Sequence, residues 1–210
     1  MCGIICVLSR KTRRATPTAS EILALLDGAL EAGAKNDIDQ LAQAVTTADR
    51  LLRGDAGQLC MADNHQLIAA MTSRIDQLDA IVIAYEQSIE KSAGLQSESS
   101  QHALQEIIRA KDAIWELRND RIRTAKLVDA LAGQGASESA RRGYFSIQQA
   151  FSGLDRLEVR GRDSAGIHVL VSNHGLKATD KQVKALLANR SEDALFMSGS
   201  VRMTENAWSF

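Results

Sequence analysis

Apolar side chains recur every three or four positions through the middle of the chain, which is the spacing of one face of an α-helix. The clearest run alternates steps of three and four, as does the seam of a helix packed against another helix. Its members are Ile68, Met71, Ile75, Leu78, Val82, Tyr85 and Ile89. Helix-breaking residues are sparse here, because Pro17 is the one proline of the chain and four glycines lie between residues 59 and 143. The pattern therefore predicts that this region is largely helical.

Three further helices are predicted around this one. Ser99 or Ser100 can cap a partner helix that ends near Gly133, because serine satisfies free backbone N–H groups at a helix start and glycine commonly follows a helix end. Upstream, Ser20 opens a shorter helix and Asp37 opens another. Four helices joined by short loops favour an antiparallel bundle.

The two ends of the chain have a different pattern, typical of strands and turns. Residues 3–8 form a short apolar, β-branched run that is long enough for one buried strand. A second strand is predicted from Ala165, and a hairpin is predicted at the turn residues 172–175 that follow it. Asp180 can cap a helix over residues 181–189. Two more strands are predicted at residues 195–203 and 207–210.

These patterns predict two domains, one inserted into the other. The outer domain comprises residues 1–19 and 141–210, and the inserted helical bundle comprises residues 20–140. A helix over residues 142–158 would bring the chain back to the outer domain. Because the sequence ends in the apolar letters AWSF, with no polar tail, we expect the chain to continue beyond this point.

Composition restricts the function classes without selecting one. The 210 residues are 45% apolar and 24% charged, which argues against disorder and against membrane spans. Twenty-five basic and twenty-six acidic side chains give a net charge of −1, so neither nucleic acid nor a membrane surface is an expected partner. The apolar N-terminal run precedes its basic residues, the reverse of a secretory signal. A cytoplasmic location is predicted.

Cysteine and histidine spacing predicts neither a disulfide framework nor a metal site. The three cysteines, Cys2, Cys6 and Cys60, form no CxxC pair. His65 and His102 lie in the helical region without a second evident ligand one turn away. No metal and no cofactor are therefore expected.

Cys2 becomes the N-terminal residue if Met1 is removed, and this gives it unusual chemistry. A free α-amine has a pKa of about 7.7 to 8.0 and lies within reach of the sulfur of its own residue. Nucleophile and general base then belong to one residue, and no distant histidine is required. A small buried cysteine at the start of a strand is the alternative interpretation.

A second motif lies at residues 157–167, LEVRGRDSAGI. Gly161 and Gly166 bracket a charged loop between a predicted helix and a predicted strand, and glycine permits a tight backbone turn. Arg160 and Asp163 can pair with each other or hydrogen-bond to backbone within this loop.

The start MCGII together with LEVRGRDSAGI resembles the class II glutamine amidotransferase domain. The LExRGxDSAGI form is most similar to the glutamine:fructose-6-phosphate amidotransferase (glucosamine-6-phosphate synthase) family, in its long actinobacterial-type form. The resemblance covers about 70 terminal residues. It implies an α+β fold in which part of an N-terminal-nucleophile hydrolase αββα sandwich is interrupted by the large all-α insertion, so that helix dominates by residue count.

The resemblance also implies a reaction and a set of site residues. Cys2 would attack the side-chain amide of glutamine and release ammonia, which a sugar-isomerase domain beyond this chain would transfer to fructose 6-phosphate. Supporting roles around the nucleophile and its loop fall to Gly3, Arg160, Gly161, Asp163, Ser164 and Gly166. For Asp163 and Ser164 a structural role is favoured over direct catalysis.

The sequence departs from the family in two respects. The 157 residues between Cys2 and Arg160 exceed the family's spacing, and the helical bundle accounts for the excess. No His-Thr-Arg-Trp segment, no Asn-Gly pair for an oxyanion hole and no later Gly-Asp is present, and we expect these elements to follow Phe210. The alternative function is a helical interaction or scaffold protein with an inactive amidotransferase-like remnant. Its apolar seam could form a homodimer.

Overall fold

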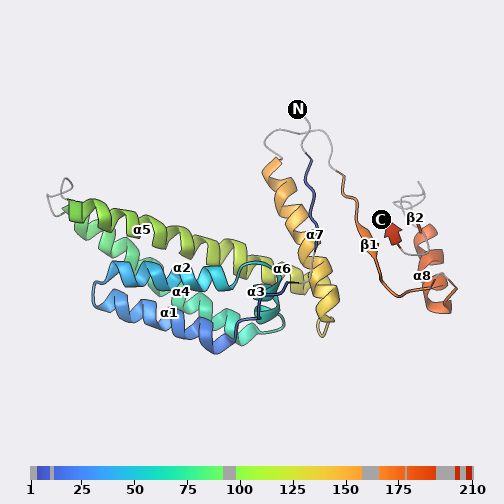
Figure 1. The fold of residues 1–210 in the computed structure, drawn as a ribbon, viewed down its shortest axis with the longest axis horizontal. Helices are drawn as coiled ribbons and strands as arrows, with labels where there is room; N and C mark the ends of the chain where they lie inside the picture. The colour runs from blue at the N-terminus through green and yellow to red at the C-terminus, as the bar shows by residue number, and fades with distance from the viewer. Residues whose placement is uncertain are drawn as a thin grey trace. The chain divides into compact units, whose positions relative to one another are not determined.

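The computed structural model describes residues 4–9, 12–91, 98–157, 166–177, 179–192, 202–203 and 207–209. Helix dominates these residues, as the sequence predicts (Figure 1). The chain divides into two compact units: residues 6–151 form one, and residues 1–5 together with 152–210 form the other. The predicted domain bounds at residues 19/20 and 140/141 stay a prediction.

The larger unit contains the four predicted helices. They are α1 (Ala19–Ala34), α2 (Ile38–Leu51), α4 (His65–Lys91) and α5 (Glu98–Glu116), the last of which continues through η1 (Leu117–Ile122) into α6 (Arg123–Ala132). Asp37 caps α2 as predicted, through a bond from the Gln40 backbone N–H to its side chain. The cap of α1 is Thr18, which forms a capping box with Glu21, so the helix begins at Ala19, one residue before the predicted opening at Ser20.

Consecutive long helices run antiparallel, but the bundle is not a simple ring in chain order. Around the bundle the order is α1, α2, α5, α4, so that α1 lies beside α4, and α2 lies beside α5. Figure 1 shows that both of these neighbouring pairs run parallel. The link from α2 to α4 therefore crosses the bundle diagonally. The short helix α3 (Gly54–Met61), which the sequence pattern does not predict, forms part of this crossing.

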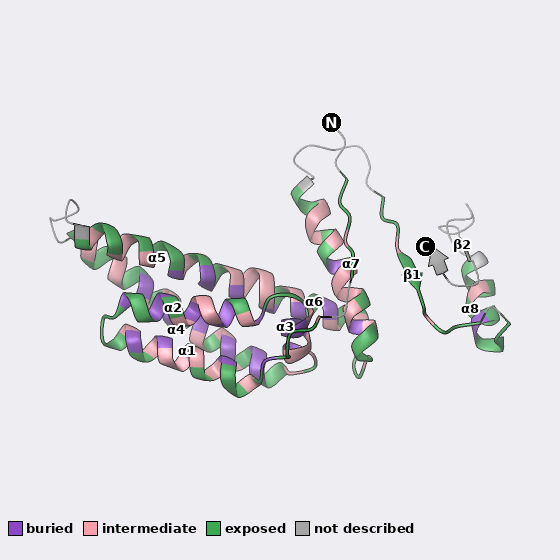
Figure 2. Ribbon diagram, viewed as in Figure 1, coloured by how far each residue is buried: buried purple, intermediate pink, exposed green. Residues whose placement is uncertain are grey.

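The apolar seam predicted on α4 forms its buried face. Ile68, Met71, Ile75, Leu78 and Val82 are all at most 4% exposed, while Tyr85 and Ile89 are partly buried against the same core. Figure 2 shows the buried positions on the facing sides of the helices. At about 1.5 to 3 kcal/mol for each large apolar side chain removed from water, this interior is the main stabilising term of the unit.

The π-helical segment η1 changes the register of the α5 seam. The buried positions step from Leu117 to Ile122, a spacing of five, where a regular α-helix would have a step of three or four. Not every apolar side chain of this long helical segment is buried. Ile108, next to the buried Ile107, is 58% exposed, and beyond η1 Leu127 and Leu131 are 37% and 43% exposed.

Helix α7 (Glu138–Leu157) begins four residues before the predicted position. Arg141, whose side chain is 6% exposed, pairs with both Asp63 and Asp129, and Arg142 lies 3.2 Å from Asp55. These ion pairs anchor the first turns of α7 to the loop after α3, to α6 and to α3.

The smaller unit contains α8 (Lys181–Ser191) and three short strands. The strands are β1 (Leu170–Ser172), β2 (Arg202–Met203) and β3 (Ala207–Ser209), arranged antiparallel in the order β1-β3-β2. The strand after Ala165 and the pair of C-terminal strands are thus present, although shorter than predicted. The helix after Asp180 is also present and extends two residues beyond its predicted end. The hairpin predicted at residues 172–175 is wrong, because β1 pairs with β3 and not with the segment that follows it.

The strand predicted at residues 3–8 is also wrong for the residues that the structure describes there. Residues 4–9 form no strand, and Ile4 and Leu8 are 95% and 81% exposed. An apolar run becomes a buried strand only where a sheet edge hydrogen-bonds to it and a core covers it, and neither condition is met among the described residues. Within the described parts of the chain, no helix has the length and hydropathy needed to cross a bilayer.

Candidate functional site

The structure describes one of the seven predicted site residues. Cys2, Gly3, Arg160, Gly161, Asp163 and Ser164 lie outside the described residues. Gly166 lies in an exposed segment that leads into β1, and among the described residues no atom of another part of the chain comes within 4 Å of the position of a Cβ there. That these seven residues form one site stays a prediction.

A close contact joins the described residues that flank the two motifs. Ile5, three positions after Cys2, packs against Gly153 of α7, seven positions before Arg160. A Cβ at Gly153 would lie 2.5 Å from Ile5 Cδ1 and 3.3 Å from Ile5 Cγ2, so only glycine fits without a shift of Ile5. The smaller unit thus joins chain segments from before and after the bundle.

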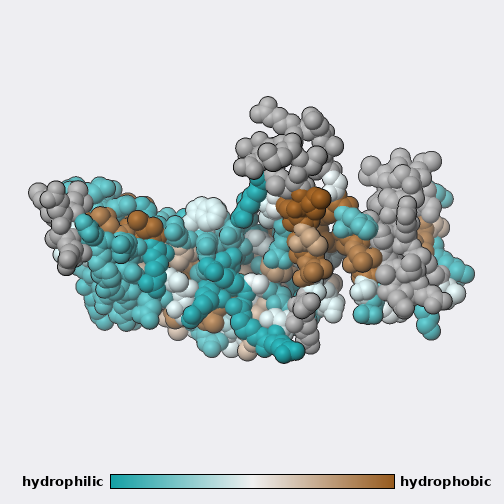
Figure 3. All heavy atoms as spheres, turned by 45° about the horizontal axis from the view of Figure 1, so that its top comes forward, coloured by the Kyte–Doolittle hydropathy of each residue, from teal (hydrophilic) through white to brown (hydrophobic). Residues whose placement is uncertain are grey.

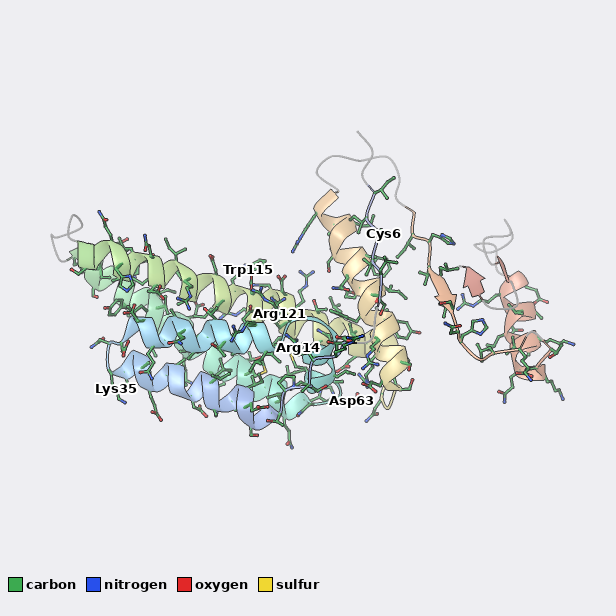
Figure 4. The ribbon with its side chains drawn as sticks, viewed as in Figure 1. Cys6, Arg14, Lys35, Asp63, Trp115 and Arg121 are labelled. Carbon is green, nitrogen blue, oxygen red and sulfur yellow. The ribbon has the colours of Figure 1, made fainter. Side chains whose placement is uncertain are left out.

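The other two cysteines occupy different surroundings. Cys6 is exposed and lies in the extended segment before the bundle (Figure 4). Cys60 lies on α3 and is partly buried against the core. Burial, with a smaller contribution from the charge of Glu21, raises the pKa of the Cys60 thiol. Because the thiolate is the reactive form, Cys60 is a poor nucleophile at neutral pH.

A network of charged side chains crosses from α2 to α5 and η1. Asp49 is 1% exposed and accepts hydrogen bonds from Arg53 Nε and Arg121 Nε, each at 2.9 Å. Glu116 accepts from the same two arginines, at 2.7 Å from Arg53 and 3.2 Å from Arg121. The π-helical turn projects Arg121, labelled in Figure 4, toward α2.

The surroundings shift the pKa values of the two carboxyl groups of this network in opposite directions. Burial, reinforced by the hydrogen bond with Glu116, raises the pKa of Asp49. Burial also opposes the charge of Glu116, but its hydrogen bonds with Asp49 and Arg53 and the charge of Arg121 together lower its pKa. Each of the two carboxyl groups accepts hydrogen bonds from arginine side chains. The cluster is therefore better explained as a structural link between helices than as a substrate-binding site.

Two surface pockets lie on the bundle. One, of about 520 Å³, lies between α4 and the η1–α6 segment and has Arg118, Arg123 and Lys126 in its wall. The charge of Arg118 is compensated there, because it pairs with Asp76 at 3.0 Å and Asp79 at 3.2 Å. The other, of about 290 Å³, lies between α2 and α5 beside the Asp49 network. Most of the bundle surface visible in Figure 3 is hydrophilic.

Sequence reasoning misses one cluster of ligand-type side chains. His102 and Glu106 on α5 come together with Asp39 of α2, and one ligand atom from each lies within 4.8 Å of the others. The expectation that His102 has no second ligand one turn away is wrong, because Glu106 lies four positions after it on the same helix. The aspartate is not evident from the sequence, because it comes from another helix.

Comparisons with protein-family models, with curated proteins and with solved structures give no match to this chain. The two terminal motifs and the contact between Ile5 and Gly153 are therefore the observations that bear on its function.

Proposed function

We propose that this chain is the N-terminal part of a glutamine amidotransferase in which Cys2 is the nucleophile. The carrying observation is that two motifs of this enzyme class flank an intervening bundle, and that Ile5 and Gly153, next to those motifs, are in contact. An inserted domain must leave and re-enter its host at neighbouring points, and this contact supports such an arrangement. The outer domain would then belong to the αββα sandwich fold of N-terminal-nucleophile hydrolases.

In this proposal the sulfur of Cys2 attacks the side-chain carbonyl carbon of glutamine. The α-amine of Cys2 takes the proton from the thiol as the carbon–sulfur bond forms. The same proton then goes to the amide nitrogen as the carbon–nitrogen bond breaks, and ammonia leaves. Water then cleaves the glutamyl thioester, which releases glutamate and regenerates the thiol. The ammonia passes to fructose 6-phosphate in a sugar-isomerase domain outside this chain.

The remaining site residues have supporting roles in this mechanism. Arg160 packs beside the nucleophile, while Gly161, Asp163, Ser164 and Gly166 shape the loop that holds it. Helix α7 leads directly to this loop, and its contact with Ile5 would fix the distance between the loop and the N-terminus. Such positioning matters because a misplacement of about 1 Å can cost a factor of about 10² in rate.

The test is labelling of the full-length protein by a glutamine-analogue electrophile, followed by peptide mass spectrometry. We expect that Met1 is absent and that the label is found on Cys2, while Cys6 and Cys60 of the same molecules act as internal controls. Excess glutamine should protect Cys2 alone. The matched variants are Cys2→Ser, which should lose labelling, and Cys6→Ser, which should retain it.

A retained Met1, or equal labelling of all three cysteines, would overturn the proposal and favour the helical scaffold alternative. The acceptor is tested separately by glutamate release from glutamine with and without fructose 6-phosphate. Labelling of Cys2 without any stimulation by the sugar phosphate would keep the amidotransferase and reject this acceptor.

A further inference from the structure

Three side chains with metal-binding atoms meet where α2 and α5 begin. His102 and Glu106 are one helical turn apart on α5, a spacing that places both on one face. Asp39 lies in the first turn of α2, and its Oδ1 is 3.0 Å from His102 Nε2. One ligand atom from each of the three residues lies within 4.8 Å of the others.

We propose that Asp39, His102 and Glu106 bind one divalent transition-metal ion, with Zn²⁺ as the representative. The imidazole nitrogen favours a transition-metal ion over Mg²⁺ or Ca²⁺. Mg²⁺ and Ca²⁺ prefer oxygen ligands only, whereas Zn²⁺ binds nitrogen and carboxylate oxygen together. Ligands at about 2.0 to 2.1 Å from a tetrahedral zinc are separated by about 3.3 Å. The nitrogen–oxygen pair already has nearly this separation, and Glu106 needs only a side-chain movement to complete the set.

The surroundings leave room for an ion and for water. The side chains of His102 and Asp39 are 59% and 61% exposed, whereas that of Glu106 is 14% exposed and forms the inner wall of the cluster. Solvent can therefore supply the remaining coordination positions. The ion would join α2 to α5, two helices that are adjacent in the bundle although far apart in sequence.

The side chain of Arg109 opposes metal binding at this cluster. Arg109 Nη1 lies 3.0 Å from Glu106 Oε2, so this guanidinium and the metal would compete for the same carboxylate. If His102 and Asp39 only paired with each other, Glu106 would not take part in the interaction. A metal site needs Glu106, and it should gain affinity when Arg109 is removed.

The experiment measures the binding of Zn²⁺ to the full-length protein by competition with a chromophoric chelator, with Mg²⁺ as the comparison ion. Loss of a ligand in His102→Ala or Glu106→Gln should weaken Zn²⁺ binding by at least about tenfold, since even loss of a residue that only supports a ligand costs 10- to 100-fold. Arg109→Gln should strengthen it. The matched control is His65→Ala, which removes an exposed histidine of α4 and should change nothing.

The cysteines are the competing ligands in this assay, and they are present in every variant. Binding of Co²⁺ separates the two kinds of site, because thiolate ligation gives an intense charge-transfer absorption that a nitrogen and oxygen site lacks. An affinity unchanged in His102→Ala, or reduced in Arg109→Gln, would overturn the proposal. Circular dichroism checks that each variant retains its helix content.

Discussion

Asp49 shows how a charged residue can be held inside a helical bundle. Its carboxyl is removed from water, and burial raises its pKa, yet two guanidinium groups donate hydrogen bonds to it, that of Arg53 from the turn between α2 and α3 and that of Arg121 from η1. A buried ion pair of this kind contributes little net stability compared with a well-packed apolar group. We expect its main effect to be on specificity, because the hydrogen bond from Arg121 to Asp49 links η1 to α2.

Removal of Asp49 should therefore cost much more than its contribution to net stability. Asp49→Ala leaves Arg121, whose side chain is 15% exposed, without its nearest counterion. We expect the free energy of unfolding to fall by about 3 kcal/mol, the cost of breaking a buried pair. Asp76→Ala is the matched control, because the side chain of Asp76 is 61% exposed and its pair with Arg118 should contribute less than about 1 kcal/mol.

Urea denaturation followed by circular dichroism measures both variants. Equal losses in Asp49→Ala and Asp76→Ala would contradict the claim that the buried network fixes the packing of α2 against η1.

At the scale of elements, helix α7 offers a direct test of how the segment that follows Cys2 is held against the segment that precedes Arg160. It contains Gly143, where a side chain would meet open space, and Gly153, where one would collide with Ile5. Gly153→Leu should displace Ile5, and if Cys2 is the nucleophile its labelling by a glutamine analogue should slow by about tenfold or more. Gly143→Leu, which makes the same change in the same helix, should leave the labelling unchanged.

Ile5→Ala in combination with Gly153→Leu supplies the control, because the smaller side chain at position 5 removes the collision. This double variant should recover part of the labelling. A single Gly153→Leu variant that labels at the normal rate would show that the contact does not position Cys2, whether or not Cys2 is reactive.

The length and apolar periodicity of each element decide whether it could be predicted from the sequence. Helices α1, α2, α4 and α5 were predictable, because their apolar positions follow the period of an α-helix and each forms a face of the core. Helix α3 was not, since its eight residues, GDAGQLCM, contain two glycines and are too short to show a period. The π-helical turn was missed because the spacing of five from Leu117 to Ile122 is apparent only once the buried face is known.

The candidate sites divide in the same way. Cys2 and the loop around Arg160 are contiguous motifs, so they can be identified without a fold. The cluster of Asp39, His102 and Glu106 depends on α2 lying beside α5, and pairwise spacing along one helix does not contain that information. The strand predicted at residues 3–8 was wrong because an apolar run does not by itself specify a pairing partner.

For the whole molecule, the pH dependence of stability should follow the partly exposed carboxyl groups that pair with arginine. Hydrogen bonds from Arg74 to Asp27 and from Arg141 to Asp63 lower the pKa of each carboxyl. A lowered pKa contributes stability that is present above the ordinary carboxyl value of about 3.9 and is lost as the pH falls through the lowered pKa. Stability should therefore decline below about pH 4.

Asp27→Asn isolates one of these contributions. The side chain of Asp27 is 48% exposed, so its pair with Arg74 should contribute less than about 1 kcal/mol at pH 7. Thermal unfolding at a series of pH values should show a small difference between the parent and the variant at neutral pH, which vanishes in acid. A difference that persists unchanged in acid would mean that Asp27 acts through packing and not through its charge.

The burial of apolar side chains is uneven along the molecule, and this predicts where it opens first. Within residues 166–192, leaving aside 178 and the side chain of Ser191, Val183 is the one buried apolar residue, and all three residues of β1 are exposed. Helices α2 and α4, in contrast, each contribute several buried apolar residues to the core, and Figure 2 colours such buried positions purple. Local opening requires little free energy where few apolar contacts are lost. Amide hydrogen exchange measured by mass spectrometry should therefore be fast in β1 and α8 and slowest in α2 and α4. Equal protection across the chain would contradict this prediction, and it would mean that β1 and α8 are stabilised by contacts other than the described core.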